Sequence, residues 1–160
     1  MNGSTRALYE EMILEHNRHP RHFQHTPPAA THHAHGYNPV CNDDITVHLR
    51  VQDGVIRDVG FEGAGCAICT ASASMMTEAV LGRPVTEAER LFVGMRAMLT
   101  EEAGAGTAQA SLGKLRILAG VWEYPMRVKC ATLPWHTLKA ALDSRPGIVT
   151  TEEDDHVCPT

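Results

Sequence analysis

The sequence Ile45-Thr-Val-His-Leu-Arg-Val51 leads through Gln52 and Asp53-Gly54 into Val55-Ile-Arg-Asp-Val-Gly-Phe61. Apolar and polar residues alternate on both sides of the Asp-Gly pair, which is typical of strands with one buried face. Asp-Gly is strongly favoured in two-residue turns between antiparallel strands, because both positions of such a turn need a positive φ. The stretch therefore predicts a β-hairpin with strands at 45–51 and 55–61.

A helix of small residues is expected directly after this hairpin. Gly63-Ala64-Gly65 ends the second strand, and residues 66–81 are rich in Ala, Ser and Met. Such a helix can pack closely against a sheet. Gly82 and Pro84 are typical of a helix end, and a further helix is expected over 86–99.

The segments before and after this region complete the expected secondary structure. An amphipathic helix is predicted over 5–17, and it ends at His19-Pro20 because the residue before proline avoids the helical region. A loop rich in His and Pro follows over 18–36, and a stretch near 31–37 suits an edge strand. Apolar helices are expected over 112–118 and 134–142.

Together these elements predict an α+β fold in a single domain, residues 1–143. We expect a small antiparallel sheet of about three strands, with helices packed mainly on one face and a metal site at one end. Residues 144–160 are acidic and are expected to form a mobile tail.

Composition excludes several classes of protein. The chain has 160 residues, 43% of them hydrophobic, which suits one globular domain with a real core. Its net charge of −5 gives no basic face for nucleic acid. No apolar run approaches about 20 residues, and no signal peptide is recognisable, so we expect no membrane partner and a cytoplasmic location. In that compartment cysteines more often bind metals or catalyse reactions than form disulfides.

Three separated cysteines and one aspartate form a candidate ligand set: Cys41, Asp43, Cys66 and Cys130. Thiolates with a carboxylate suit zinc or iron–sulfur chemistry, and a thiolate can also carry sulfur. Cys66 is expected at a helix N-terminus, where the free N–H groups favour the thiolate. A buried cysteine that packs as a small hydrophobe is the alternative for Cys66, and a structural turn residue is the alternative for Asp43.

A second cysteine follows Cys66 at the spacing of a redox motif. Cys66-Ala67-Ile68-Cys69 matches the Cys-x-x-Cys of thioredoxin-like proteins, but that motif belongs in a βαβ context and a β-hairpin precedes it here. We therefore expect Cys69 to face the core or to flank the metal site. Cys158, in the predicted tail, has no expected role.

Several ordered motifs resemble one known family. Leu8-Tyr9-Glu10-Glu11, His16-Asn17-Arg18-His19-Pro20, Asn38-Pro39-Val40-Cys41-Asn42-Asp43, Phe61 to Ile68, Ala71 to Met76 and Arg127 to Leu133 carry the likeness. Together they make the chain similar to the IscU/NifU N-terminal type of iron–sulfur cluster assembly protein. The long segment between Cys66 and Cys130 and the lysine at 129, where IscU proteins usually have histidine, favour the SufU branch.

The resemblance implies a function and a set of site residues. Cys41, Asp43, Cys66 and Cys130 match the metal ligands of the family, and Cys41 matches the residue thought to accept sulfur. A SufU-like protein would be a zinc-dependent sulfurtransferase, taking persulfide sulfur from a SufS-like cysteine desulfurase. It would relay that sulfur to a SufBCD-type complex or to apo iron–sulfur proteins.

Two alternatives stay open at this point. The same residues could hold iron or a [2Fe–2S] cluster on a scaffold that is not an enzyme, or a structural zinc without sulfur chemistry. The chain also departs from the family pattern at three places. Asn42 replaces a glycine, Cys69 replaces a serine, and residues 19–35 are unusually rich in histidine.

Overall fold

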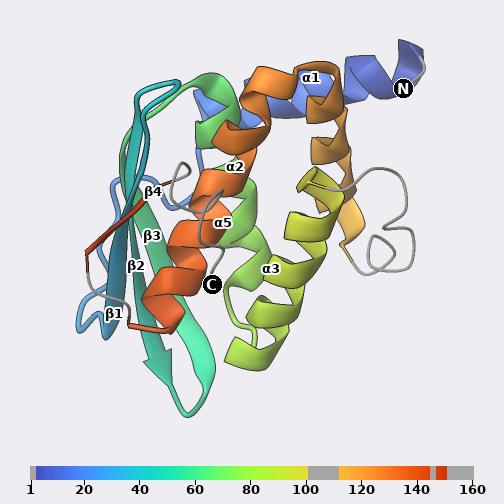
Figure 1. The fold of residues 1–160 in the computed structure, drawn as a ribbon. Helices are drawn as coiled ribbons and strands as arrows, with labels where there is room; N and C mark the ends of the chain where they lie inside the picture. Colours follow the sequence, from blue (N-terminus) through green and yellow to red (C-terminus); the bar gives the residue numbers. More distant parts are fainter. Residues whose placement is uncertain (1–2, 101–111, 145–146, 151–160) are drawn as a thin grey trace.

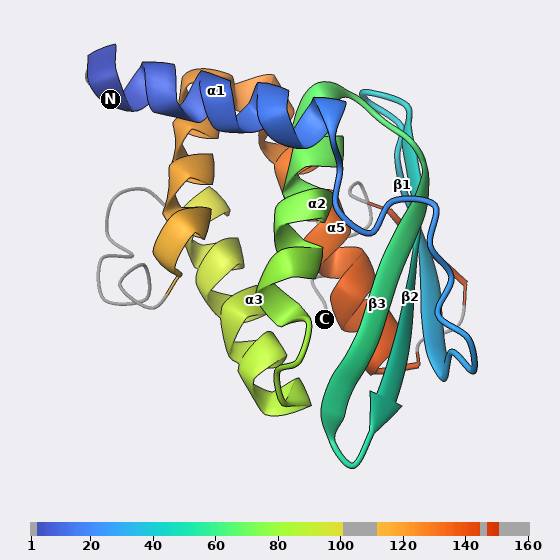
Figure 2. The same ribbon diagram turned by 180° about the vertical axis from the view of Figure 1, so that it is seen from behind.

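The computed structural model describes residues 3–100, 112–144 and 147–150. Within them a sheet lies on one side and the helices cover one of its faces, as Figures 1 and 2 show from opposite directions. In chain order the elements are α1 (Gly3–Arg18), β1 (His32–Asn38), β2 (Asp43–Gln52), β3 (Val55–Ala64), α2 (Ala67–Val80), α3 (Val85–Thr100), the 3₁₀ helices η1 (Gly113–Glu123) and η2 (Pro125–Arg127), α5 (Val128–Leu142) and β4 (Ile148–Thr150). The α+β prediction with helices on one face is confirmed.

The predicted hairpin is present and extends further than expected. β2 and β3 pair as antiparallel strands, with Val47 opposite Phe61 and Leu49 opposite Val59. Asp53 and Gly54 both have positive φ, 56° and 75°, as a primed hairpin turn requires.

The sheet has four strands in the order β3-β2-β1-β4, so the expected number of three was wrong. β1 pairs antiparallel with β2 and parallel with β4. The strand predicted near 31–37 is therefore internal and is not an edge strand. β4 falls at Ile148–Thr150, inside the stretch predicted as a tail, and it makes the sheet mixed.

The core lies between the sheet and the helices. Sheet residues such as Val47, Leu49 and Phe61 meet Met76, Leu133, Trp135 and Leu138 from α2 and α5, and all of these side chains are almost fully buried. β1 approaches α5 so closely that a Cβ at Gly36 would overlap Thr137 Oγ1. No helix within the described ranges is long and apolar enough to cross a membrane.

The last helix begins earlier than the sequence indicates. α5 starts at Val128 and continues through Pro134, although proline usually ends or kinks a helix. Contacts with α2 flank the proline: Ser72 Oγ donates to the Ala131 carbonyl at 2.7 Å, and Trp135 Nε1 donates to Ser72 Oγ at 3.2 Å. Cys130 consequently lies within the first turn of a helix.

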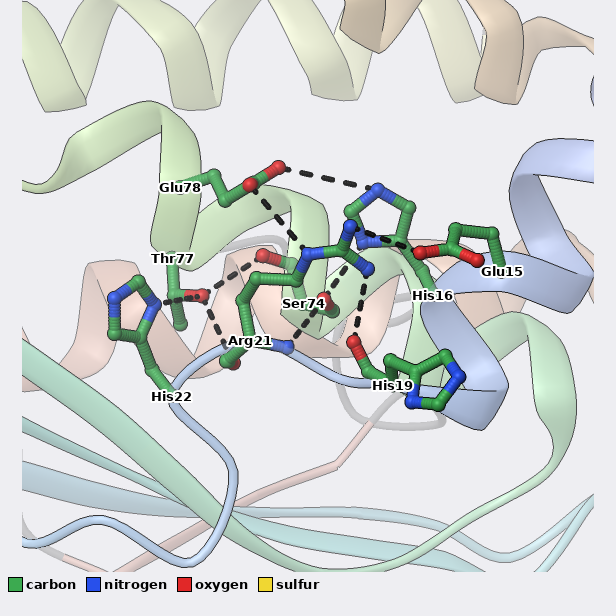
Figure 3. Close-up of polar contacts among 8 residues, drawn as sticks. All are labelled: Glu15, His16, His19, Arg21, His22, Ser74, Thr77 and Glu78. Carbon is green, nitrogen blue, oxygen red and sulfur yellow. Dashed lines mark hydrogen bonds and ion pairs between the residues drawn. The ribbon is translucent and has the colours of Figure 1, made fainter.

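A polar cluster fixes the end of α1 and the following segment against α2 (Figure 3). Ser74 Oγ lies 2.7 Å from His16 Nδ1 and accepts the Arg21 N–H at 2.8 Å. His16 Nε2 faces Glu78 Oε1 at 3.9 Å. Burial lowers the pKa of His16. The chain after α1 is thus held in place before it enters the sheet.

Candidate metal centre

The turn between β1 and β2 carries the first two candidate ligands. Asn38, fully buried at the end of β1, accepts the Val40 N–H on its side-chain oxygen at 3.1 Å. This is the local turn that Asn and Asp side chains favour. Asn42 adopts a φ of 59°, a conformation that Asn tolerates better than most residues. The replacement of the usual glycine by Asn42 is therefore compatible with the turn.

Asp43 is buried, and both of its carboxylate oxygens have hydrogen-bond donors. Oδ1 accepts the Cys66 N–H at 2.8 Å, and Oδ2 accepts Asn38 Nδ2 at 3.0 Å. Asn38 Nδ2 also lies 3.5 Å from Cys130 Sγ. A buried charge is tolerated only when it is paired in this way, so the network holds the carboxylate in one orientation.

The start of α2 carries Cys66 as its N-cap residue. Its Sγ accepts the Cys69 N–H at 3.5 Å. A hydrogen bond from Cys130 is the main cause that lowers the pKa of Cys66 to about 6, with burial opposing it. The pKa of Cys130 is raised, first by that same hydrogen bond and then by burial. The two pKa shifts are opposite in direction, so the thiolate form is favoured at Cys66 over Cys130.

Three candidate ligands converge without rearrangement. One ligand atom each from Cys41, Asp43 and Cys130 lies within 4.8 Å of the others, and Cys41 Sγ is 2.9 Å from Cys130 Sγ. Cys66 lies beside Cys130 and Asp43 but outside this mutual group. Two thiolates and a carboxylate, with a third thiolate adjacent, suit the coordination preferences of zinc and of iron–sulfur clusters.

The two cysteines of the converged group differ in accessibility. Cys130 is fully buried, whereas Cys41 is partly exposed. Arg127 Nη1 lies 3.4 Å from Cys41 Sγ. The pKa of Arg127 is raised, first by a hydrogen bond with Cys130 and then by the charges of Cys66 and Cys41. The guanidinium therefore neutralises part of the negative charge at the open side of the site.

Cys69 lies beneath the centre and outside the converged group. It is fully buried, and burial raises its pKa well above that of an ordinary thiol. A Cβ at Gly65 would lie 3.2 Å from Cys69 Sγ and 3.1 Å from Asp43 Oδ1, so a side chain there would press on both residues. Cys69 remains a neutral thiol that fills space behind the ligands. Cys158 lies outside the described residues.

Asn38 belongs to the site but was not predicted from the sequence. Its amide contacts both Asp43 on β2 and Cys130 on α5. Cys130 is 92 positions from Asn38 along the chain. No characteristic sequence spacing identifies a buried amide that orients a metal ligand. The only sequence signal was its place in the segment 38–43 that resembles the family.

Comparisons with known proteins agree with this geometry. The family model for the NifU-like N-terminal domain matches residues 8–131. An iron–sulfur cluster assembly scaffold protein IscU of Thermotoga maritima is 38% identical over 88% of this chain and 98% of its own length. The zinc-dependent sulfurtransferase SufU of Bacillus subtilis is 31% identical over 91% of this chain and 97% of its own.

A solved structure shares the fold. The crystal structure of FiSufU, a candidate cluster assembly scaffold of the SUF system from Fervidobacterium islandicum, superposes with a TM-score of 0.76. It is 32% identical and covers 85% of this chain and 97% of the FiSufU chain. The chain belongs to the NifU-like N-terminal domain family, the iron–sulfur cluster assembly proteins of the IscU and SufU type.

Proposed function

We propose that this protein is a zinc-bound sulfur acceptor of the SufU kind. It takes persulfide sulfur from a SufS-like cysteine desulfurase in the cytoplasm and relays it to a SufBCD-type complex or to apo iron–sulfur proteins. The observation that carries the proposal is the contrast within the converged ligand group: Cys41 is partly exposed, while Asp43 and Cys130 are buried. Within the converged group, a sulfur donor can reach only Cys41; Cys66, outside that group, is also partly exposed.

The ligands would be Cys41, Asp43, Cys66 and Cys130, and bound zinc would keep the thiolates ionised without redox chemistry. In the transfer, the Cys41 thiolate attacks the outer sulfur of the desulfurase persulfide. A new S–S bond forms on Cys41, the S–S bond of the donor breaks, and the donor cysteine leaves as a thiolate. One S–S bond breaks as the other forms, so the transfer involves no net oxidation or reduction.

Side chains around Cys41 support this role. Arg127, 3.4 Å from Cys41 Sγ, would stabilise negative charge on that sulfur as it attacks the donor. Exposed apolar side chains lie next to these two residues in sequence: Val40 is 49% and Met126 70% exposed. Such residues suit contact with a partner protein.

The test combines metal analysis with desulfurase stimulation. Purified protein should contain about one zinc per chain, stimulate a SufS-type desulfurase and carry a persulfide on Cys41 by mass spectrometry. Cys41→Ala should abolish stimulation, while Cys158→Ser serves as the matched cysteine control and should leave it unchanged. Normal stimulation by Cys41→Ala, or protein without stoichiometric zinc, would overturn the proposal.

A scaffold that assembles a [2Fe–2S] cluster is the second candidate. It is favoured by the names of several relatives and by the same ligand set, whereas Lys129 in place of histidine counts against it. Anaerobic reconstitution with iron and sulfide separates the two. A stable cluster chromophore that transfers to an apo-protein, together with absent zinc, would establish the scaffold.

A further inference from the structure

The outer face of the sheet, away from the helices, carries most of its strand histidines. Ala34 and Gly36 of β1 are buried against α5 and the core, so the alternating residues His33 and His35 lie on the opposite face. His48 of β2 alternates in the same way with buried Val47 and Leu49. The thiolate centre does not use this face.

Carboxylates accompany these histidines. His48 Nε2 lies 3.1 Å from Glu62 Oε2, and His35 Nε2 lies 2.6 Å from Asp44 Oδ1. On the same sheet His25 contacts Asp58 at 3.0 Å. Imidazole and carboxylate together form a donor set suited to zinc, nickel or copper.

Two of the histidines face each other across neighbouring strands. His33 is the register partner of His48, and their ring centroids are 6.2 Å apart with the ring planes inclined by 30°. Direct cross-strand partners have Cβ atoms about 4.5–5.5 Å apart. Two imidazoles on one tetrahedral metal, with metal–nitrogen distances of about 2.0–2.1 Å, place their centroids about 5 Å apart. The ligand atoms of His33, His48 and Glu62 do not all lie within 4.8 Å of one another, so exposed His33 has to turn toward the other two to complete the site.

The third ligand is already in position. Two ligand atoms on a tetrahedral metal lie about 3.3 Å apart when each metal–ligand bond is about 2.0–2.1 Å long. His48 Nε2 and Glu62 Oε2 are 3.1 Å apart, so an ion can replace their shared proton with little change in their positions. The His48 side chain is only 16% exposed, which restricts its rotation, while Glu62 is 49% exposed and leaves the site open to solvent.

We propose that His33, His48 and Glu62 form a second, exchangeable site for a divalent transition metal, with zinc as the ion tested. The site is separate from the thiolate centre: its ligands are nitrogen and oxygen, and they lie on the outer face of β1, β2 and β3. It requires no sulfur transfer, so it stands or falls independently of the proposed function.

Equilibrium dialysis of the full-length protein against zinc alone tests the site. Protein first saturated at the thiolate centre should bind a further zinc, and His33→Gln and His48→Gln should each weaken that second equivalent by more than about tenfold. His32→Gln is the matched control, because His32 is adjacent on β1 with the opposite parity and hydrogen-bonds Thr31. It should bind as the parent protein does.

Imidazole nitrogen shifts from NMR give a second measurement. Zinc should shift the ring nitrogens of His33 and His48 and leave those of His32 unchanged. His33 is exposed, so its replacement should leave the thermal unfolding midpoint unchanged and keep the test interpretable even if His48→Gln unfolds. A second zinc that persists in His33→Gln, or a parent protein that binds no second zinc, would overturn the proposal.

Discussion

Replacing Asn38 by serine should weaken metal binding at the thiolate centre without unfolding the protein. Serine keeps a side-chain oxygen that can accept the Val40 N–H of the turn, but it is too short to reach Asp43 or Cys130. The variant therefore removes the donor that holds Asp43 Oδ2 at 3.0 Å and contacts Cys130 Sγ at 3.5 Å.

The size of the effect follows from the role of that amide. Residues that orient metal ligands typically contribute about 10–100-fold to affinity, or about 1.4–2.7 kcal/mol. Loss of a hydrogen bond to a buried carboxylate costs a comparable 1.5–3 kcal/mol, roughly, in the metal-free protein. We therefore expect a 10–100-fold weaker zinc affinity and a modestly lower unfolding midpoint.

Competition with a chromophoric zinc chelator measures the affinity, and calorimetry measures the stability of the same samples. Asn42→Gly is the matched control, since it changes an exposed residue of the same turn and glycine accepts the φ of 59° at that position. It should bind zinc as tightly as the parent. An Asn38→Ser variant with parental affinity but reduced stability would show that Asn38 supports only the turn, and the reasoning would be refuted.

Three further predictions concern stability and the remaining thiol. Cys69→Ser should keep its zinc, because burial favours the neutral form of this thiol and zinc binds the thiolate; metal analysis that finds the zinc lost would make Cys69 a ligand. Ser74→Ala should lower the unfolding free energy by about 2–4 kcal/mol, since it strands His16 Nδ1 and the Arg21 N–H in a buried region; denaturant titration measures this, and a change below about 0.5 kcal/mol would contradict it. The lowered pKa of His16 means that the unfolded chain takes up this proton first as pH falls below about 6.5, so stability drops there; His16→Gln should remove up to about 1.4 kcal/mol per pH unit of that slope, and an unchanged slope would exclude the contribution.

Local patterns predicted the hairpin well because its determinants are neighbours in sequence. Alternation fixed both faces of β2 and β3, and Asp53-Gly54 supplied the two positive φ values of the turn. β4 was missed because three residues cannot show a period, and its parallel pairing with β1 joins segments more than a hundred positions apart. Because β4 was not predicted, β1 was expected to be an edge strand instead of an internal one.

The start of α5 shows how a tertiary contact overrides a local rule. Pro134 indicates a helix start near itself, since proline is favoured in the first turn. In the fold, Ser72 on α2 donates to the Ala131 carbonyl and accepts from Trp135 Nε1, so the helix packs against α2 on both sides of the proline. The prediction of a helix over 134–142 was therefore too short, and Cys130 was placed before a helix instead of inside one.

The same distinction between local and distant contacts separates the roles of the candidate ligands. Cys130 is anchored inside α5, and Asp43 is held by donors from β1 and from the start of α2, so neither can leave without breaking buried hydrogen bonds. Cys41 is held by its own turn and by contacts with Cys130 and exposed Arg127. Cys41 is only partly buried, so releasing its sulfur disturbs the core less than releasing Asp43 or Cys130 would. If the protein holds a metal and also offers one thiolate to a donor, as proposed, this inequality would make Cys41 the labile ligand, because it is the partly exposed member of the converged group.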